Sequence, residues 1–266
     1  MDKSIRLSRG VFAAIFIGLG ITGLVNGGFA LVWQDVPKGV PGYTVLAYIS
    51  AVVELLAGLG LFFEATLSLA SRAVFVFTLL WVVLLKLPHW FTAPGVISSW
   101  GGSGEIGIVL SGAWVLFASH AGAWEQRVLP FAVGEGGIRI ARAIFIVSLP
   151  LIGVVHFLEI DGVADFVPGW LPFHYFLGYL TGSASFVAAL GLIIGVWPRL
   201  AAALESFMLG VITVLCWGPM LHTGRTACTA FLISSAITVG AWVVADTYRN
   251  GSWLARGRMS KAIALD

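Results

Sequence analysis

The chain has 266 residues, of which 59% are hydrophobic and only 11% are charged, and its formal net charge is +2. A soluble protein of this length needs more polar side chains to cover its surface, so the composition excludes a soluble globular domain. Lipid is a suitable solvent for such a chain. We therefore predict an all-α integral membrane protein that has the lipid bilayer as its main partner.

Eight apolar stretches recur along the chain, and each is a candidate for a membrane-spanning helix. In chain order they cover residues 11–32, 43–63, 73–87, 104–120, 141–157, 173–196, 200–217 and 226–245. The third, fourth and fifth stretches are short, so we expect flanking residues or a thinner local bilayer to complete these spans. The first stretch is too long for the apolar core of a signal peptide, and we predict that it is a retained helix.

Basic residues are distributed unevenly among the segments that connect these stretches. With the N-terminus on the cytoplasmic side, only Lys38, Lys86 and Arg225 of the fifteen lysines and arginines fall on the outer side. Multi-pass proteins concentrate Lys and Arg in their cytoplasmic loops. The distribution therefore predicts eight spans in the cell (inner) membrane with cytoplasmic N- and C-termini. The positive net charge reports this orientation, and we predict no nucleic-acid partner.

The chain also contains an internal repeat. When the sequence is shifted by 131 positions, residues 36–88 fall on residues 167–219 without a gap and with fourteen identities, among them Pro37/Pro168 and Gly60/Gly191. Each copy holds four apolar stretches, so both copies enter the membrane from the same side, and their symmetry axis is expected along the membrane normal. The repeat predicts eight transmembrane helices arranged as two parallel four-helix-bundle repeats.

The repeat also defines the expected domain organisation. The first repeat is placed at residues 1–120 and the second at 139–246, with a cytoplasmic linker at 121–138 and a basic cytoplasmic tail at 247–266. The basic residues of this tail are Arg249, Arg256, Arg258 and Lys261. We interpret the tail as an ordinary cytoplasmic flank, and contact with anionic lipid headgroups is the alternative interpretation.

The second copy carries three short motifs close to the expected span ends. They are His156-Phe157, Val167-Pro168-Gly169-Trp170-Leu171-Pro172 and Arg199-Leu200-Ala201-Ala202. Through these motifs the second half resembles the DoxX-like family of small four-span membrane proteins, and the first half resembles it only through the repeat. The resemblance implies redox-associated work in a membrane complex with a partner protein. The family often carries an acid in its second span, and this chain has Glu54 there in the first half but Ser185 in the second.

Polar residues within the expected spans form a candidate intramembrane pocket. Glu54 is the twelfth residue of its stretch, about 16 Å from the outer helix end, where an ionised carboxylate is costly. We interpret it as an acid that relays a proton or binds a cationic or quinone-like ligand, or alternatively as a neutral acid bonded to a neighbouring helix. Glu205 lies near the cytoplasmic start of its stretch, within reach of Arg199 or water, and we interpret it as a snorkelling or paired structural residue. The candidate pocket residues are Glu54, Asn26, His156, Lys86, His89 and Glu105.

The two cysteines, Cys216 and Cys228, flank a short outer hairpin and are candidate redox thiols. The alternative interpretation is two unrelated buried thiols, because the sequence does not show whether the two side chains meet. The histidines lack the spacing of a dedicated ligand pair, so we predict no metal site.

Three functions stay open at this point. The first hypothesis, which follows from the family resemblance, is an accessory or quinone-interacting subunit of a redox-associated membrane complex, with quinone as the cofactor. The alternatives are a small-solute transporter or exporter and a non-catalytic membrane scaffold. Whether the chain is an enzyme also stays open.

Overall fold

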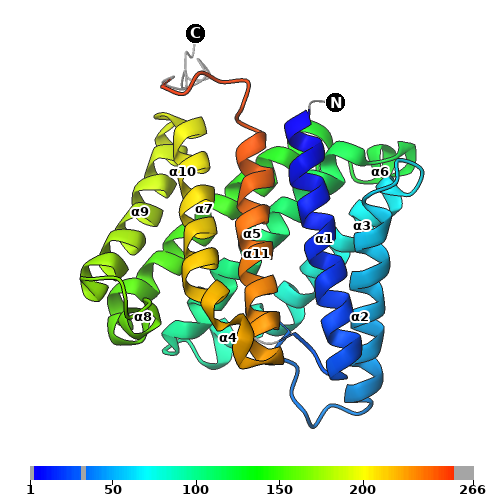
Figure 1. Ribbon diagram of the computed structural model, residues 1–266. Helices are drawn as coiled ribbons and strands as arrows, with labels where there is room; N and C mark the ends of the chain where they lie inside the picture. Colours follow the sequence, from blue (N-terminus) through cyan, green and yellow to red (C-terminus); the bar gives the residue numbers. More distant parts are fainter. Residues whose placement is uncertain (1–2, 31–33, 255–266) are drawn as a thin grey trace.

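A computed structural model describes residues 3–30 and 34–254, and this part of the chain is helical, without a β-strand. Eight of its helical segments are long and apolar enough to cross a membrane, which confirms the predicted number of spans. Figure 1 shows that α1 (Lys3–Asn26) begins, and α11 (Arg225–Asp246) ends, at the same end of the molecule. We refer to this as the inner end and to the opposite one as the outer end. Residues 255–266, which hold most of the predicted basic tail, lie outside the described residues.

Of the remaining six spans, four are single helices and two, the third and the seventh, consist of several helical segments. Single helices form α2 (Tyr43–Gly60), α5 (Ile97–His120), α7 (Gly134–Leu158) and α9 (His174–Ile194). The third span consists of α3 (Leu67–Trp81), the π-helix η1 (Val82–Lys86) and α4 (Leu87–Thr92). The seventh span consists of α10 (Pro198–Ile212), the π-helix η2 (Thr213–Trp217) and the 3-10 helix η3 (Gly218–Thr223). Two short helices, α6 (Ala123–Val128) and α8 (Ile160–Phe166), connect spans.

Flanking residues complete the three short apolar stretches, as expected from the sequence. The third, fourth and fifth spans have 26, 24 and 25 residues, so each is at least about 36 Å long. Residues 97–103, which include two glycines, and residues 134–140, which include glycines and the charged Glu135 and Arg139, continue the helices beyond the apolar stretches. The outer end of the first span was predicted too late in the sequence, since α1 ends at Asn26 and the outer connection begins at Gly27.

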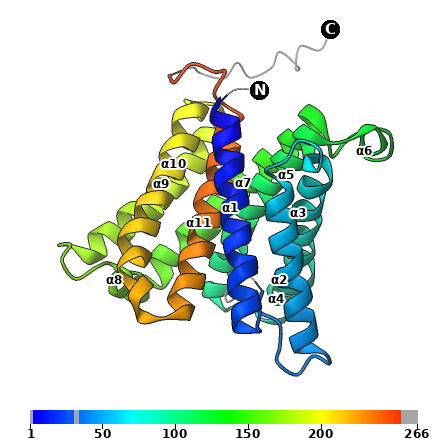
Figure 2. The same cartoon turned by 45° about the vertical axis from the view of Figure 1, so that its right-hand side comes forward.

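The eight spans form a closed ring, and two of them also meet across its centre. Helix α1 packs against α2 and α11, α7 packs against α5 and α9, and α5 contacts α11. The first helix of each half therefore lies against the last helix of the other half, and the two halves interlock (Figure 2). We name the group around α1, α2 and α3 the first lobe and the group around α7, α9 and α10 the second lobe, with α5 and α11 between them.

Helix bounds recur along the chain with the offset of the sequence repeat. Adding 131 to the bounds of α3 gives those of α10, and adding it to the bounds of η1 gives those of η2. The π-helices thus interrupt both composite spans at the same place, and π-helical turns are frequent at functional sites. The common register also allows the polar residues of the two halves to be compared position by position.

Glycines allow the central helices to approach closely. A Cβ atom on Gly112 of α5 would lie 2.7 Å from the Cα atom of Gly240 in α11. Conversely, a Cβ atom on Gly240 would lie 2.8 Å from the carbonyl oxygen of Ile108. Small residues at helix contacts are characteristic of membrane proteins, where close backbone packing drives association. Helix α5 is the most enclosed span of the ring, and 83% of its most apolar window is buried.

Candidate ligand-binding cavity

A cavity of about 470 Å³ lies in the outer half of the second lobe, and its walls are mainly apolar. Residues from α5, α7, α8, α9, α10, η2 and α11 line it, so every element of the second lobe contributes. Helix α8 closes one side, because the ring of Phe166 meets the ring of Trp217 in η2 with centroids 4.5 Å apart. Figure 2 shows α8 at the outer end, to the side of the main bundle.

Six polar side chains line this apolar cavity: Glu105 from α5, His156 from α7 and Cys216 from η2, together with Glu159, Thr181 and Ser234. The Nδ1 atom of His156 lies 3.0 Å from the carbonyl oxygen of Ile152. Because a carbonyl oxygen only accepts, Nδ1 is the protonated nitrogen and Nε2 of the neutral ring is available as an acceptor. The Glu105 carboxyl forms no hydrogen bond with any residue of the described part of the chain, and it interacts electrostatically with Lys86.

The corresponding space in the first lobe is filled by the connection between α1 and α2. Phe29 of this connection contacts the rings of Tyr43 and Trp81 edge-on, with centroids 5.1 Å and 5.6 Å away. Further along, the Gln34 side chain enters the lobe and is only 3% exposed. A void of about 10 Å³ is left there, which has room for about one water molecule. At the offset of 131 residues, 29–35 correspond to 160–166, which form α8 at the side of the second-lobe cavity and leave its interior open.

Glu54 is the polar centre of this filled space. Nε2 of Gln34 donates hydrogen bonds to Oε1 of Glu54 at 2.6 Å and to Oγ of Ser50 at 3.2 Å. Oε1 of Gln34 accepts one from the backbone N–H of Ala30 at 2.8 Å. Glu54 is 2% exposed. The side chain that donates a hydrogen bond to its carboxyl group belongs to the outer connection and not to a neighbouring spanning helix. Sequence reasoning missed Gln34, because a glutamine in a connecting segment carries no signal of burial.

The second lobe holds its own buried carboxyl group, on a different helix. Oγ of Ser185 in α9 donates to Oε1 of Glu205 in α10 at 2.8 Å, and Glu205 is 2% exposed. Glu205 is therefore a paired residue, one of the two predicted alternatives, but its partner is Ser185, and the buried side chain does not snorkel. Ser185 occupies the position of Glu54, whereas Glu205 occupies that of Val74. Each half thus holds one buried carboxyl group: Glu54 meets the outer connection of the first lobe, and Glu205 lies between α9 and α10.

The six candidate pocket residues do not form one pocket in the structure. Glu54 and Asn26 line the small void of the first lobe, while Glu105 and His156 line the cavity of the second lobe. Lys86 is buried in η1, and its Nζ atom lies near Gly102, one helical turn before Glu105 on α5. His89 is exposed, lines neither space, and contacts the carbonyl oxygen of Leu85 through Nδ1 at 2.8 Å.

Both cysteines are free thiols. Cys216 lines the cavity, whereas Cys228 is not among the lining residues, and its Sγ atom lies 3.8 Å from the carbonyl oxygen of Leu221. Within residues 3–30 and 34–254, no group of three or more His, Cys, Asp and Glu side chains is placed to hold a metal ion. No family model, curated protein or solved structure matches the chain.

Proposed function

We propose that the protein is a redox-associated membrane protein that binds a quinone-type ligand in the second-lobe cavity and works as an accessory subunit with a partner protein. The observation that carries the proposal is a cavity of about 470 Å³ with mainly apolar walls, whose titratable lining side chains include Glu105 and His156. Its volume lies within the range of small-molecule sites, and a few convergent polar groups in an apolar cavity are typical of such sites.

The chemistry of a quinone fits this arrangement. Its isoprenoid tail needs apolar walls, and its ring carries two oxygens that accept hydrogen bonds as a quinone and donate them as a quinol. Nε2 of His156 would accept from a quinol hydroxyl group, and a protonated Glu105 would donate to a quinone oxygen. The motifs around His156 and Val167-Pro168 resemble those of DoxX-like proteins, which supports the redox assignment.

We also propose that the chain arose from two copies of a parallel four-span unit. Support comes from the fourteen identities and from the recurrence of helix bounds at the offset of 131 residues. In this proposal the first copy has lost its cavity to the connection that carries Gln34, and the second has kept it. The distribution of basic residues favours a cell-membrane protein with both termini on the cytoplasmic side.

The quinone proposal predicts a specific pattern among polar variants. Full-length protein in nanodiscs of defined lipid would be incubated with a short-chain quinone, and retention of the quinone would be followed by native mass spectrometry. We expect Glu105→Gln and His156→Gln to weaken binding roughly fivefold to tenfold each, the value of about one hydrogen bond. His89→Gln is the matched control, because His89 is exposed and lines neither space. Equal binding by all variants, or no binding by the wild type, would contradict the proposal.

The buried carboxyl groups favour proton-coupled transport as a second candidate function. Glu54 accepts a hydrogen bond from the neutral side chain of Gln34, and Glu205 accepts one from that of Ser185. Intramembrane acids of this kind commonly relay protons. In proteoliposomes with an imposed proton gradient, Glu54→Gln is expected to abolish any proton-coupled solute flux that the wild type shows. Unchanged flux in this variant would rule out proton coupling through Glu54. A protein that binds no quinone and carries no flux would be a scaffold.

A further inference from the structure

A second cavity, of about 540 Å³, lies at the inner end of the second lobe. It is formed by the start of α10, the end of α11 and the segment that follows α11. That segment is held in place by two arginines. Nε of Arg142 donates to Oγ1 of Thr247 at 2.8 Å, and Nη1 of Arg199 donates to the carbonyl oxygen of Gly251 at 3.0 Å. Hydrogen bonds between residues far apart in the sequence therefore hold the wall of the cavity that follows α11 in place.

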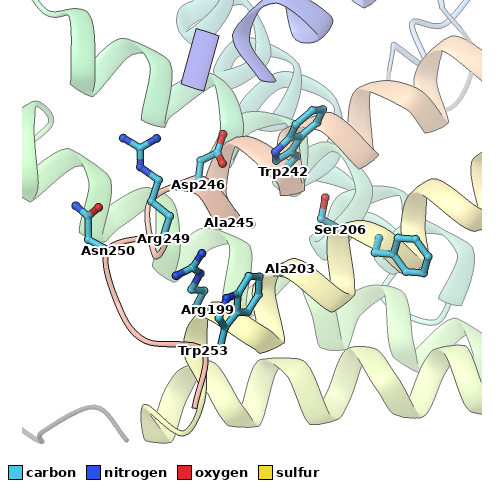
Figure 3. A pocket seen from close by; sticks show the side chains of 10 residues that line it. Arg199, Ala203, Ser206, Trp242, Ala245, Asp246, Arg249, Asn250 and Trp253 are labelled. Carbon is cyan, nitrogen blue, oxygen red and sulfur yellow. The ribbon is translucent and has the colours of Figure 1, made fainter. Parts of the chain in front are cut away.

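Two guanidinium groups, those of Arg199 and Arg249, line this cavity together with the single carboxylate of Asp246. The Asp246 carboxylate accepts a hydrogen bond from Oγ of Ser8 at 2.7 Å. Arg199 lies over the ring of Trp253 at 4.0 Å from its centroid, which fixes the plane of the guanidinium group (Figure 3). A guanidinium group held in one plane is suited to bidentate recognition of a phosphate.

The first half also has an arginine near the start of its third span, four residues from Ser68, the residue that matches Arg199 at the offset of 131. In the first half, the arginine at the start of α3 is Arg72, and its Nε atom forms an ion pair with Oε1 of Glu125 at 3.1 Å. In the described part of the chain, Arg199 forms no ion pair with a carboxylate. The position of Arg72 is occupied in the second half by Ala203, which lines the cavity. The arginine near the start of the third span is thus paired with a carboxylate in the first half, whereas Arg199, in the described part of the second half, is not.

The cavity is also amphipathic along the direction of the spans. Its charged side chains lie at the inner end, whereas Phe207 lines the part of the cavity nearer the middle of α10. The Phe207 side chain is 70% exposed and faces away from the interior of the helix ring. Trp242 and Trp253 add the aromatic groups that are enriched at membrane interfaces. Figure 3 shows Arg249 and Asn250 on the opposite side of the cavity from Trp242 and Ser206.

We infer that this inner cavity binds the phosphate group of an anionic phospholipid, with an acyl chain of the lipid along Phe207. Arg199 and Arg249 supply the positive charge, Trp253 holds Arg199 in position, and the apolar face of α10 accommodates the chain. This inference is independent of the quinone proposal, because the two cavities lie at opposite ends of the second lobe.

The test measures lipid binding to the full-length protein in detergent by native mass spectrometry. Phosphatidylglycerol, phosphatidylcholine and sn-glycerol 3-phosphate are added in separate titrations. The wild type is expected to bind phosphatidylglycerol at least fivefold more tightly than phosphatidylcholine, and glycerol 3-phosphate only weakly. Equal binding of the two lipids would overturn the inference. Tight binding of glycerol 3-phosphate alone would also overturn it, in favour of a soluble phosphate ester.

A matched pair of variants separates charge from folding. Ala203→Glu places a carboxylate one helical turn from Arg199 without removing a contact of the segment after α11, and Ala203→Gln adds the same bulk without charge. We expect Ala203→Glu to weaken phosphatidylglycerol binding roughly fivefold, the effect of about one charge near an anionic surface, and Ala203→Gln to bind at least threefold better than Ala203→Glu. Arg199→Gln should resemble Ala203→Glu, provided that its melting temperature is unchanged. Equal phosphatidylglycerol binding by the two Ala203 variants would overturn the inference.

Discussion

Gly240→Ala is expected to destabilise the protein by roughly 1–3 kcal/mol or more, although it adds only one methyl group. The new Cβ atom would lie 2.8 Å from the carbonyl oxygen of Ile108 and 3.1 Å from the Cα atom of Val109. Both are backbone atoms of α5, so no side-chain rotation can relieve the contact. The helices α5 and α11 would have to separate at the centre of the ring. Gly112→Ala should have a similar effect, because its Cβ atom would meet the backbone of Gly240.

Gly10→Ala is the matched control for this prediction. Gly10 also lies inside a spanning helix, but the nearest atom to a Cβ atom there is a ring carbon of Phe62 at 3.8 Å, an ordinary contact. The higher helix propensity of alanine, about 1 kcal/mol relative to glycine, should leave this variant as stable as the wild type or more stable. Unfolding in mixed micelles, followed by circular dichroism, gives both values. Equal stability of Gly240→Ala and Gly10→Ala would show that α5 and α11 do not pack as closely as described.

The number of spans could be predicted from the sequence, because a bilayer requires long apolar helices whatever their neighbours are. The ends of the spans could not, since residues such as Gly101 and Glu135 continue helices that hydropathy alone would end. The interlocking of the halves was equally inaccessible. The apolar pattern of α1 is satisfied by packing against α5 or against α11, and only the three-dimensional arrangement selects α11.

The candidate site was predicted only in part for a related reason. Glu54, Glu105 and His156 attract attention because they are polar residues within apolar stretches. Gln34 lies in a connecting segment, where burial of a polar side chain has no sequence signature. The cavity of the second lobe is formed by apolar residues that resemble any other lipid-facing or core residues. The internal repeat offers the one usable signal. At the offset of 131 residues, Glu54 is replaced by Ser185 and Val74 by Glu205, an exchange that indicates contact between the second and third spans.

Gln34→Ala is expected to destabilise the protein by roughly 1–3 kcal/mol, the cost of leaving a buried polar group without its partner. The substitution removes the amide that donates to Glu54 at 2.6 Å and to Ser50 at 3.2 Å, and it leaves a carboxyl group that is 2% exposed. Asn26→Ala is the control, because Asn26 lines the same void without a hydrogen bond to any described residue. Its effect should stay within about 0.5 kcal/mol.

A double-mutant cycle distinguishes a specific bond from general packing of the connection. Glu54→Ala alone removes the shorter of the two hydrogen bonds that Nε2 of Gln34 donates, leaves Ser50 as its acceptor and opens additional space, so it should also be destabilising. In the double variant both partners of the 2.6 Å contact are gone, and the loss of stability should be smaller than the sum of the two single losses by roughly 1–2 kcal/mol. Additive losses would mean that Gln34 only fills space and that Phe29, with its ring contacts to Tyr43 and Trp81, holds the connection in the first lobe. A large coupling energy would instead identify the Gln34–Glu54 contact as the bond that keeps the first lobe closed while the second lobe contains a cavity.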